Sequence, residues 1–268
     1  MLRIADAHTG RLVEIPSAHR HLLRICVHLP AIDNGIGALH LRVLLLGDVL
    51  ARTAELRGLQ SLTALTAPDL PQEQVQALDR VMAVLGIHPP ATVRAHDPGE
   101  APSAAADVHV IAHGAEQPDS VGGVLIDVGQ VGTAPPEEGG PGSPDAAVPE
   151  GPDPLAVRML LLGHAYRTPV MVTGAVLVEA RRTLRHWRQS VADWAQEPSR
   201  PIPADLLRQA HAALADNLDL PALLDMLRSV EGDTSVPAGA KFETFAYLDR
   251  VLGLDLAREV GHQYQVTP

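Results

Sequence analysis

Lysine is almost absent from this 268-residue chain, in which Lys241 is the only one. Between Arg94 and Arg158 there is no Lys or Arg, whereas the same stretch holds eleven Asp or Glu, a number equal in magnitude to the net charge of -11. An acidic stretch of this kind repels phosphate at long range. The low pI, about 5.5, argues against a nucleic-acid surface, so tRNA is not the partner that we expect.

Aromatic residues make up only 3% of the chain, so its core must rest on Leu, Val, Ala and Ile. The single cysteine, Cys26, excludes internal disulfides and any metal site built from several cysteines. No apolar run approaches the roughly 20 residues of a membrane-spanning helix, and the N-terminus is polar. We therefore expect a cytoplasmic protein with no membrane partner.

Strand and helix signals alternate in the first half of the chain. A Thr9-Gly10 turn predicts a hairpin over residues 2–15. Apolar runs predict strands at residues 22–29, 61–65, 107–112 and 124–128, and helical periodicity predicts helices at 40–57 and 71–85. This alternation predicts a parallel α/β sheet.

The second half of the chain is different in character. Residues 133–152 are rich in Pro, Gly and acid, which predicts a mobile linker that is dispensable for folding. After it only helices are expected, at residues 154–166, 173–195, 203–217, 221–230 and 240–252, with Thr173 and Asp205 as candidate caps. The expected fold is α/β, with a reduced Rossmann-like domain (1–132), the linker (133–152) and an all-α helical bundle (153–268).

Three segments resemble one protein family. Residues 153–169 (DPLAVRMLLLGHAYRTP) are similar to the start of the helical bundle in cysteinyl-tRNA synthetases and the related mycothiol cysteine ligases, which read like DPLALRLLLLSHHYRSP. Residues 83–95 (AVLGIHPPATVRA) resemble the family's ALGVLPPDVEPRA, and the N-terminal hairpin is also similar. The resemblance implies a class I synthetase fold, here without an anticodon-binding domain.

The family's ATP-binding signature, His-Ile-Gly-His or His-Ile-Gly-Asn, is largely missing. An ungapped match over residues 27–50 places it on Gly37-Ala38-Leu39-His40, so that only His40 survives. A register shifted by two residues places it on Gly35-Ile36-Gly37, and the first histidine is again missing. His40 and Arg42 could hold an anion at a helix start, or they could be structural leftovers. The remnant ligand pocket implied by the resemblance comprises His28, Pro30, Asn34, Gly37, His40, Arg42 and Asp127.

The family's lysine loop is also replaced. Residues 126–132 (IDVGQVG) resemble the MHVGMVG that precedes a Lys-Met-Ser-Lys-Ser loop in the family, but residues 137–141 read Glu-Glu-Gly-Gly-Pro. Positioned charges of this kind are worth roughly 3–4 kcal/mol per donor in a transition state. We therefore expect no activation of cysteine and no catalytic residues.

A metal site is not expected from the sequence. The family's zinc-binding Cys falls on His28, with Cys26 two residues earlier, and the other three ligands have no counterpart. His109 and His113 lie four apart, hence on one face of a strand, and with His28 they could form a three-His zinc site. The alternative is that they are exposed or hydrogen-bonded histidines, so we expect no zinc and no other cofactor, with ATP required only if the chain is an enzyme.

The expected helical bundle offers one candidate interface. Trp187 and Trp194 lie seven residues apart and share one helix face, where they either pack in the core or form a contact surface for a second copy or another protein. The basic stretch 181–188 is expected to be a solvated helix face, with an acceptor-stem contact as the alternative. Asp48 is expected at an exposed helix position.

These observations predict a degenerate, truncated paralogue of the cysteinyl-tRNA synthetase and mycothiol cysteine ligase family. The expected function is that of a non-catalytic binding or regulatory protein, acting through protein contacts or a small ligand. One alternative is an ATP-dependent amino-acid (cysteine) ligase or carrier-charging enzyme with a rebuilt site. A second alternative is a tRNA-binding accessory protein.

Overall fold

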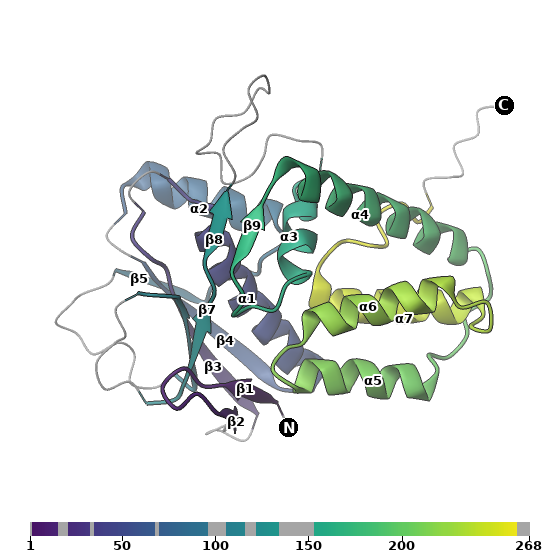
Figure 1. Cartoon of the computed structure of the whole chain (residues 1–268), viewed down its shortest axis with the longest axis horizontal. Coiled ribbons are helices and arrows are strands. Elements are labelled where there is room, and N and C mark those ends of the chain that lie inside the picture. Colours follow the sequence, from purple (N-terminus) through teal and green to yellow (C-terminus); the bar gives the residue numbers. More distant parts are fainter. Residues whose placement is uncertain are drawn as a thin grey trace.

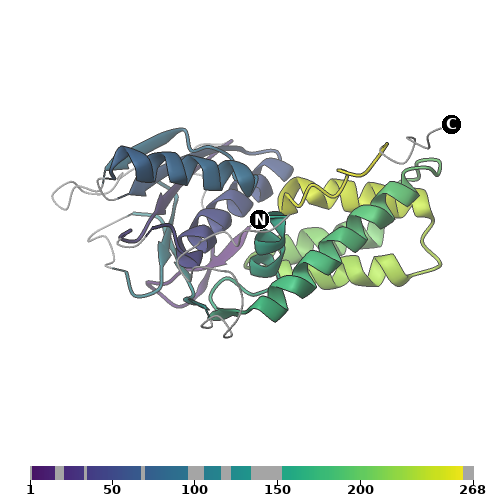
Figure 2. The ribbon, with the colours of Figure 1, turned by 90° about the horizontal axis from the view of Figure 1, so that it is seen from above.

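The computed structural model describes residues 2–15, 21–32, 35–67, 70–95, 106–115, 122–133 and 153–261. Asn34 and nearly all of the expected linker 133–152 lie outside these ranges. Within them, a sheet half is followed along the chain by a helical half, and the two lie side by side (Figures 1 and 2). No helix in these ranges is long and apolar enough to cross a membrane.

The N-terminal hairpin is present and is fastened to the main sheet. Strand β1 (Arg3–Ala5) pairs antiparallel with β2 (Leu12–Glu14). The carboxylate of Asp6, which follows β1, accepts hydrogen bonds from the N–H of Leu125 at 3.1 Å and from the hydroxyl of Thr9 at 2.8 Å. Because Leu125 belongs to β7 (Val124–Val128), Asp6 fixes the hairpin to the edge of the sheet.

The anchoring role of Asp6 predicts a pH-dependent stability. Burial alone would raise the pKa of Asp6, but hydrogen bonds from the Thr9 hydroxyl and from the N–H groups of Leu125, His8 and Thr9 outweigh it and lower the pKa. A lowered folded-state pKa gives stability that is present above the unfolded pKa of about 4 and is lost as the pH falls through the folded value. We expect Asp6→Asn to lower the free energy of unfolding by about 1–3 kcal/mol at pH 7.

Urea unfolding of wild type and Asp6→Asn at pH 7 and at several values below pH 4 measures this effect. The gap between the two proteins should narrow as the pH falls. Asp205→Asn is the control, because the Asp205 side chain is 74% exposed. A gap that stays constant over the whole pH range would show that the charge of Asp6 contributes nothing.

Five parallel strands form the main sheet in the order β5-β4-β3-β6-β7. Strand β3 (Leu22–His28) lies at the centre, followed along the chain by α1 (Ala38–Leu56), β4 (Gln60–Ala67), α2 (Gln72–Val84), β5 (Thr92–Ala95), β6 (Val108–Ala112) and β7. The order runs outward from β3 to one edge and then resumes on the other side of β3, as in Rossmann folds. The predicted fold class is confirmed, although β5 was not expected as a strand.

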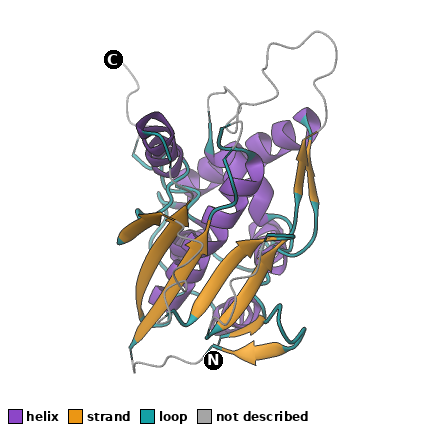
Figure 3. Ribbon diagram, turned by 90° about the vertical axis from the view of Figure 1, so that its left-hand side faces the viewer, coloured by secondary structure: helices purple, strands orange, loops and turns teal. Residues whose placement is uncertain are grey.

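The two faces of the central strands differ. On one face α1 packs so closely that a Cβ added at Gly47 would lie 2.5 Å from Cγ2 of Val27. Figure 3 shows the strands toward the viewer and the helices behind them. Because side chains alternate along a strand, Cys26 and His28 of β3 lie on the face opposite Val27. The register pairs Cys26 with His109 of β6, which places His109 on that same face.

The helical half follows β8 (Val131–Thr133), which pairs in parallel with β9 (Val170–Val172). The expectation of helices only after residue 153 is therefore wrong at β9. The helices are α3 (Leu155–Leu162), α4 (Gly174–Trp194), α5 (Ala204–Ala215), α6 (Leu220–Gly232) and α7 (Ala238–Leu252). Thr173 caps α4 by accepting from the N–H of Val176, whereas Asp205 lies inside the first turn of α5 and Pro203 holds the cap position.

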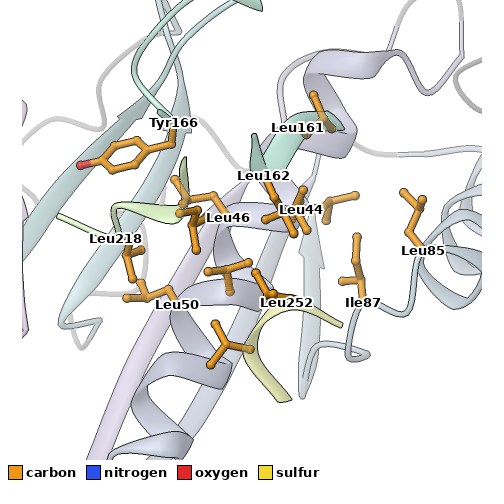
Figure 4. Close-up of a cluster of buried hydrophobic side chains, with 14 of the residues drawn as sticks. Leu44, Leu46, Leu50, Leu85, Ile87, Leu161, Leu162, Tyr166, Leu218 and Leu252 are labelled. Carbon is orange, nitrogen blue, oxygen red and sulfur yellow. The ribbon is translucent and has the colours of Figure 1, made fainter. Parts of the chain in front are cut away.

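One continuous hydrophobic core joins the two halves. Figure 4 shows Leu46 and Leu50 of α1 in a cluster with Leu162 of α3 and Leu252 of α7. The buried Trp187 packs edge-on against Phe245 of α7, with ring centroids 5.4 Å apart. The helical half is thus packed directly on α1 rather than held beside it by a linker alone.

Buried charged side chains also connect the two halves. They correct the expectations that Asp48 is exposed and that the basic stretch 181–188 is a solvated helix face. Asp48 is not at an exposed position: its side chain and that of Arg158 have no exposed surface, and they form an ion pair of 2.6 Å between α1 and α3. Arg188 belongs to the basic stretch of α4 but is buried, and it donates to the carbonyl of Leu254 at 2.6 Å and to the carboxylate of Asp153. Both errors arose because the partner is distant in sequence.

Candidate functional site at the switch point of the sheet

The centre of the sheet marks where a ligand site is expected in this fold. In open α/β sheets ligands bind outside the carboxyl ends of the strands, at the point where the strand order reverses. Here that point lies between β3 and β6. His28 is the last residue of β3, so its side chain stands at this edge.

Three side chains that can bind metals meet there. Nε2 of His28 and Nδ1 of His109 lie 3.0 Å apart, and their rings are stacked with centroids 5.3 Å apart. Sγ of Cys26 lies 3.4 Å from Oγ1 of Thr66 on β4. One ligand atom from each of Cys26, His28 and His109 can be chosen so that all lie within 4.8 Å of one another. We refer to these three residues as the Cys-His-His cluster.

Burial sets the protonation of the cluster. It raises the pKa of the Cys26 thiol, against smaller opposing effects of Thr66 and Arg94. It lowers the pKa of His109, against a smaller opposing effect of the Gly122 backbone. In the absence of a cation, a neutral thiol and a neutral imidazole are thus the favoured forms at pH 7. Nε2 of His109 is buried without a well-formed hydrogen bond to any residue in the described ranges.

His113 does not join this cluster. Its Nδ1 lies 2.7 Å from Oδ2 of Asp127 on β7, and its side chain is 59% exposed. The three-His arrangement of His28, His109 and His113 considered from the sequence is therefore not formed, and Cys26 takes the third place. The spacing of Cys26 and His28, two apart on a predicted strand, was the signal that could have pointed to this pair.

The side chain of His40 forms hydrogen bonds with backbone groups at the start of α1. Its Nδ1 accepts from the N–H of Gly37 at 2.9 Å, as in one half of a capping box, and its Nε2 lies 3.2 Å from the carbonyl of Ala31. Nδ1 is thus the acceptor, and Nε2 is the nitrogen that donates to Ala31. His40 is buried, Gly37 is the cap residue, and Pro30 is partly buried in the preceding loop.

The side chain of Arg42 likewise forms hydrogen bonds with backbone groups. Its guanidinium donates to the carbonyls of Gly129 at 2.9 Å, Thr168 at 2.7 Å and Ala165 at 2.8 Å. It thereby ties the turn after β7 to the loop after α3. Burial lowers the pKa of Arg42 to about 10, so the side chain is still charged at pH 7. Only 3% of its surface is exposed.

Gly129 explains why the family-like segment 126–132 meets this loop so closely. A Cβ added at Gly129 would lie 2.5 Å from the carbonyl oxygen of Arg167. The N–H of Gly129 donates to the carbonyl of Tyr166 at 2.8 Å, and Arg42 bridges the same two segments. Seven residues were predicted for the remnant pocket. Of these, His40 and Arg42 are hydrogen-bonded to backbone groups, Asp127 is paired with His113, and His28 belongs to the Cys-His-His cluster. Asn34 lies outside the described residues.

Two cavities in the described part of the chain lie away from this edge. A small one, next to α1, is lined by Val27, Asp48 and His88. A more open cleft of about 380 Å³ lies at the junction of the two halves, beside Arg52, Asp249 and Arg258. Neither cavity is lined by His28, His40 or Arg42 of the ligand pocket predicted from the sequence.

The two tryptophans of the candidate interface, Trp187 and Trp194, are buried to different extents in the helical half. Trp187 is completely buried and donates from Nε1 to Glu231 at 3.0 Å, which confirms the core-packing alternative for this residue. Trp194 is partly buried, and its ring lies 5.0 Å from that of Phe245. The pair therefore does not form an exposed tryptophan patch.

Comparison with known proteins identifies relatives for part of the chain. The chain is 37% identical over 113 residues to the L-cysteine:1D-myo-inositol 2-amino-2-deoxy-alpha-D-glucopyranoside ligase of Streptomyces griseus, a match that covers 40% of this chain and 26% of the relative. This chain is a partial homologue of these ligases. The ligase of the same name from Catenulispora acidiphila is 38% identical over 106 residues, 36% of this chain and 23% of the relative.

The extent of the match limits what it establishes. The ligase of Rhodococcus erythropolis is 36% identical over 115 residues, which is 40% of this chain and 26% of the relative. The chain thus matches about a quarter of the length of these curated relatives. No family model matches it. The resemblance inferred from residues 83–95 and 153–169 agrees with this partial homology to L-cysteine ligases.

Proposed function

We propose that this chain is a non-catalytic, cysteine-ligase-like protein that acts by binding rather than by ATP-dependent ligation. The observation that carries this proposal is the use made of His40 and Arg42. These two basic residues match the signature segment of the family. The side chains of both form hydrogen bonds with backbone groups of this chain. A side chain held in this way has to give up several bonds before it can contact a phosphate.

The charge around the site supports the same proposal. Catalysis of phosphate chemistry rests mainly on positioned cations that stabilise the transferring group. In this chain two acids and two glycines stand where the resemblance expects the lysine loop, and no Lys or Arg occurs between Arg94 and Arg158. An acidic segment there weakens the long-range attraction of a nucleotide.

This proposal predicts that the chain does not bind ATP with useful affinity. Calorimetric titration of the purified chain with ATP and magnesium should show no saturable binding below about 1 mM, which corresponds to roughly 4 kcal/mol. The Streptomyces griseus ligase, titrated under the same conditions, serves as the comparison.

A micromolar dissociation constant for ATP that His40→Ala weakens at least tenfold would contradict the proposal. Asp205→Asn, which alters an exposed carboxylate on α5, provides a matched control for effects of altered charge. ATP binding that neither substitution changes would place the nucleotide elsewhere and would equally oppose the proposed loss of binding.

The alternative function is an ATP-dependent amino-acid ligase with a rebuilt site. The homology to ligases that act on L-cysteine favours it. It requires new cations for the phosphates, and the nearest candidates in the described cleft are Arg52 and Arg258. Arg52 already donates to Asp48 and to the carbonyl of Gly86, and Arg258 pairs with Asp255. We therefore place this alternative second.

A further inference from the structure

We propose that the Cys-His-His cluster of Cys26, His28 and His109 binds one transition-metal ion of the zinc type. This inference goes beyond the proposed function and does not depend on it. The resemblance does not assign this set: only His28 falls on a zinc-ligand position of the family, and His109 was not matched to one. The sequence led us to expect no zinc because three of the four zinc ligands of the family have no counterpart in this chain.

The distances are close to those of a tetrahedral site. With zinc–nitrogen bonds of about 2.0 Å and a zinc–sulfur bond of about 2.3 Å, two nitrogens of a tetrahedral site lie about 3.3 Å apart, and nitrogen and sulfur about 3.5 Å. Here the two imidazole nitrogens lie 3.0 Å apart, and the ligand atoms all lie within 4.8 Å of one another. Side-chain movements of about an ångström would bring all three to one ion.

The scaffold holds these ligands in place. Cys26 and His109 are directly paired residues of two neighbouring parallel strands, and His28 follows two residues after Cys26 on the same face. Sites built on paired strands are positioned more accurately than sites on loops. Both Cys26 and His109 are about 1% exposed, and burial of this kind shields a bound ion from competing water.

The ligand types select the class of ion. A thiolate and two imidazoles suit zinc, cobalt or copper, whereas calcium and magnesium prefer oxygen ligands. Binding converts the Cys26 thiol to a thiolate, and the thiol proton is released to solvent. Three protein ligands leave a fourth position open, as in zinc sites that bind a further molecule. The Thr66 hydroxyl, 3.4 Å from the sulfur, lies beside the cluster.

The contact between His28 and His109 can also be explained without a metal ion, by a proton shared between the two facing nitrogens. In that case the two rings share an ordinary hydrogen bond, with a proton on one of the two facing nitrogens. A metal ion would occupy the place of that proton and would draw the Cys26 sulfur toward it. The two explanations therefore differ in whether a thiolate–metal bond can be detected.

Cobalt(II) titration of the full chain, stripped of metal with a chelator, tests the proposal. One cobalt ion per chain should produce a thiolate-to-cobalt charge-transfer band and the visible bands of a tetrahedral site, and zinc should abolish both. Cys26→Ser should remove the charge-transfer band. His109→Ala should weaken binding by more than the roughly 10–100-fold that is typical of losing an outer-sphere partner.

His113→Ala is the matched control, because His113 lies on the same run of chain but is paired with Asp127. It should leave the spectrum and the affinity unchanged. Circular dichroism establishes whether each variant is folded, and a zinc-dependent rise in the melting temperature of the wild type provides a test that needs no variant.

Absence of a charge-transfer band in the wild type at stoichiometric cobalt would overturn the proposal without reference to any variant. A band that survives in folded Cys26→Ser or folded His109→Ala would overturn the ligand set. Loss of the band in His113→Ala would do the same. None of these results bears on ATP binding, so this inference and the proposed function can fail separately.

Discussion

Replacing Arg158 by methionine is expected to lower the free energy of unfolding by about 3–5 kcal/mol. The guanidinium of Arg158 donates to Asp48 at 2.6 Å and to the carbonyls of Leu252 and Leu85 at 2.5 and 3.0 Å. Methionine fills most of the same volume but donates no hydrogen bond. The Asp48 carboxylate would then be left buried with Arg52 as its remaining close arginine, and two buried carbonyls would lose their partner.

Urea unfolding followed by tryptophan fluorescence and by circular dichroism measures this change. Fluorescence reports on the helical half, which contains Trp187 and Trp194, and circular dichroism reports on the whole chain. Because the two halves share one core, both transitions should shift together in Arg158→Met. Separate transitions would show that the helical half unfolds independently of the sheet.

Arg182→Met provides the control for loss of a positive charge. Its side chain on α4 is 81% exposed and lies 3.8 Å from Glu179, a surface pair that contributes about 0–1 kcal/mol. If Arg158→Met costs no more than Arg182→Met, the buried ion pair does not hold α3 to α1 and the account of the junction is wrong.

The fold could be predicted from the sequence where the signal is local. The hydrophobic run of β3, the helical periodicity of α2 and the Gly10 turn each lie within about fifteen residues, and each predicted the element that the structure contains. The three missed strands, β5, β8 and β9, have only three or four residues. Such short segments give no alternation that can be distinguished from a loop.

The candidate site could be predicted only in part, because its geometry depends on pairing between distant segments. The register that places Cys26 beside His109 brings together residues 83 positions apart. A sequence pattern carries no information about that register. It also cannot show that His113 turns to Asp127, so the histidine set inferred from spacing included the wrong member.

Buried charges are the third feature that the sequence concealed. Asp48 sits at a polar position of a predicted helix, and without its partner such a residue is expected to face solvent. The partner, Arg158, follows 110 residues later and is buried with it. The same reasoning applies to Arg188, whose carbonyl partners near residues 254–255 are supplied by the chain after α7.

Under the proposed function, the residues that this chain shares with the signature segment of the ligases serve structural roles. The relatives are named as L-cysteine ligases, and about two fifths of this chain aligns with one of them. In this chain His40 caps a helix and Arg42 ties two loops together. Residues 137–141, where the resemblance expects a loop with two lysines, read Glu-Glu-Gly-Gly-Pro.

Cysteine-dependent exchange of labelled pyrophosphate into ATP is the most direct measurement of this central claim. In the forward step the cysteine carboxylate attacks the α-phosphate of ATP, forms cysteinyl adenylate and releases pyrophosphate, and the exchange reports the reverse. Loss of two independent charge-stabilising contacts should reduce the rate about 10⁴-fold or more. We therefore expect the purified chain to show no cysteine-dependent exchange above background, with the Streptomyces griseus ligase assayed alongside. Exchange within about tenfold of that ligase, abolished by His40→Ala and unaffected by the exposed-site variant Asp205→Asn, would contradict the account and establish the chain as an active ligase.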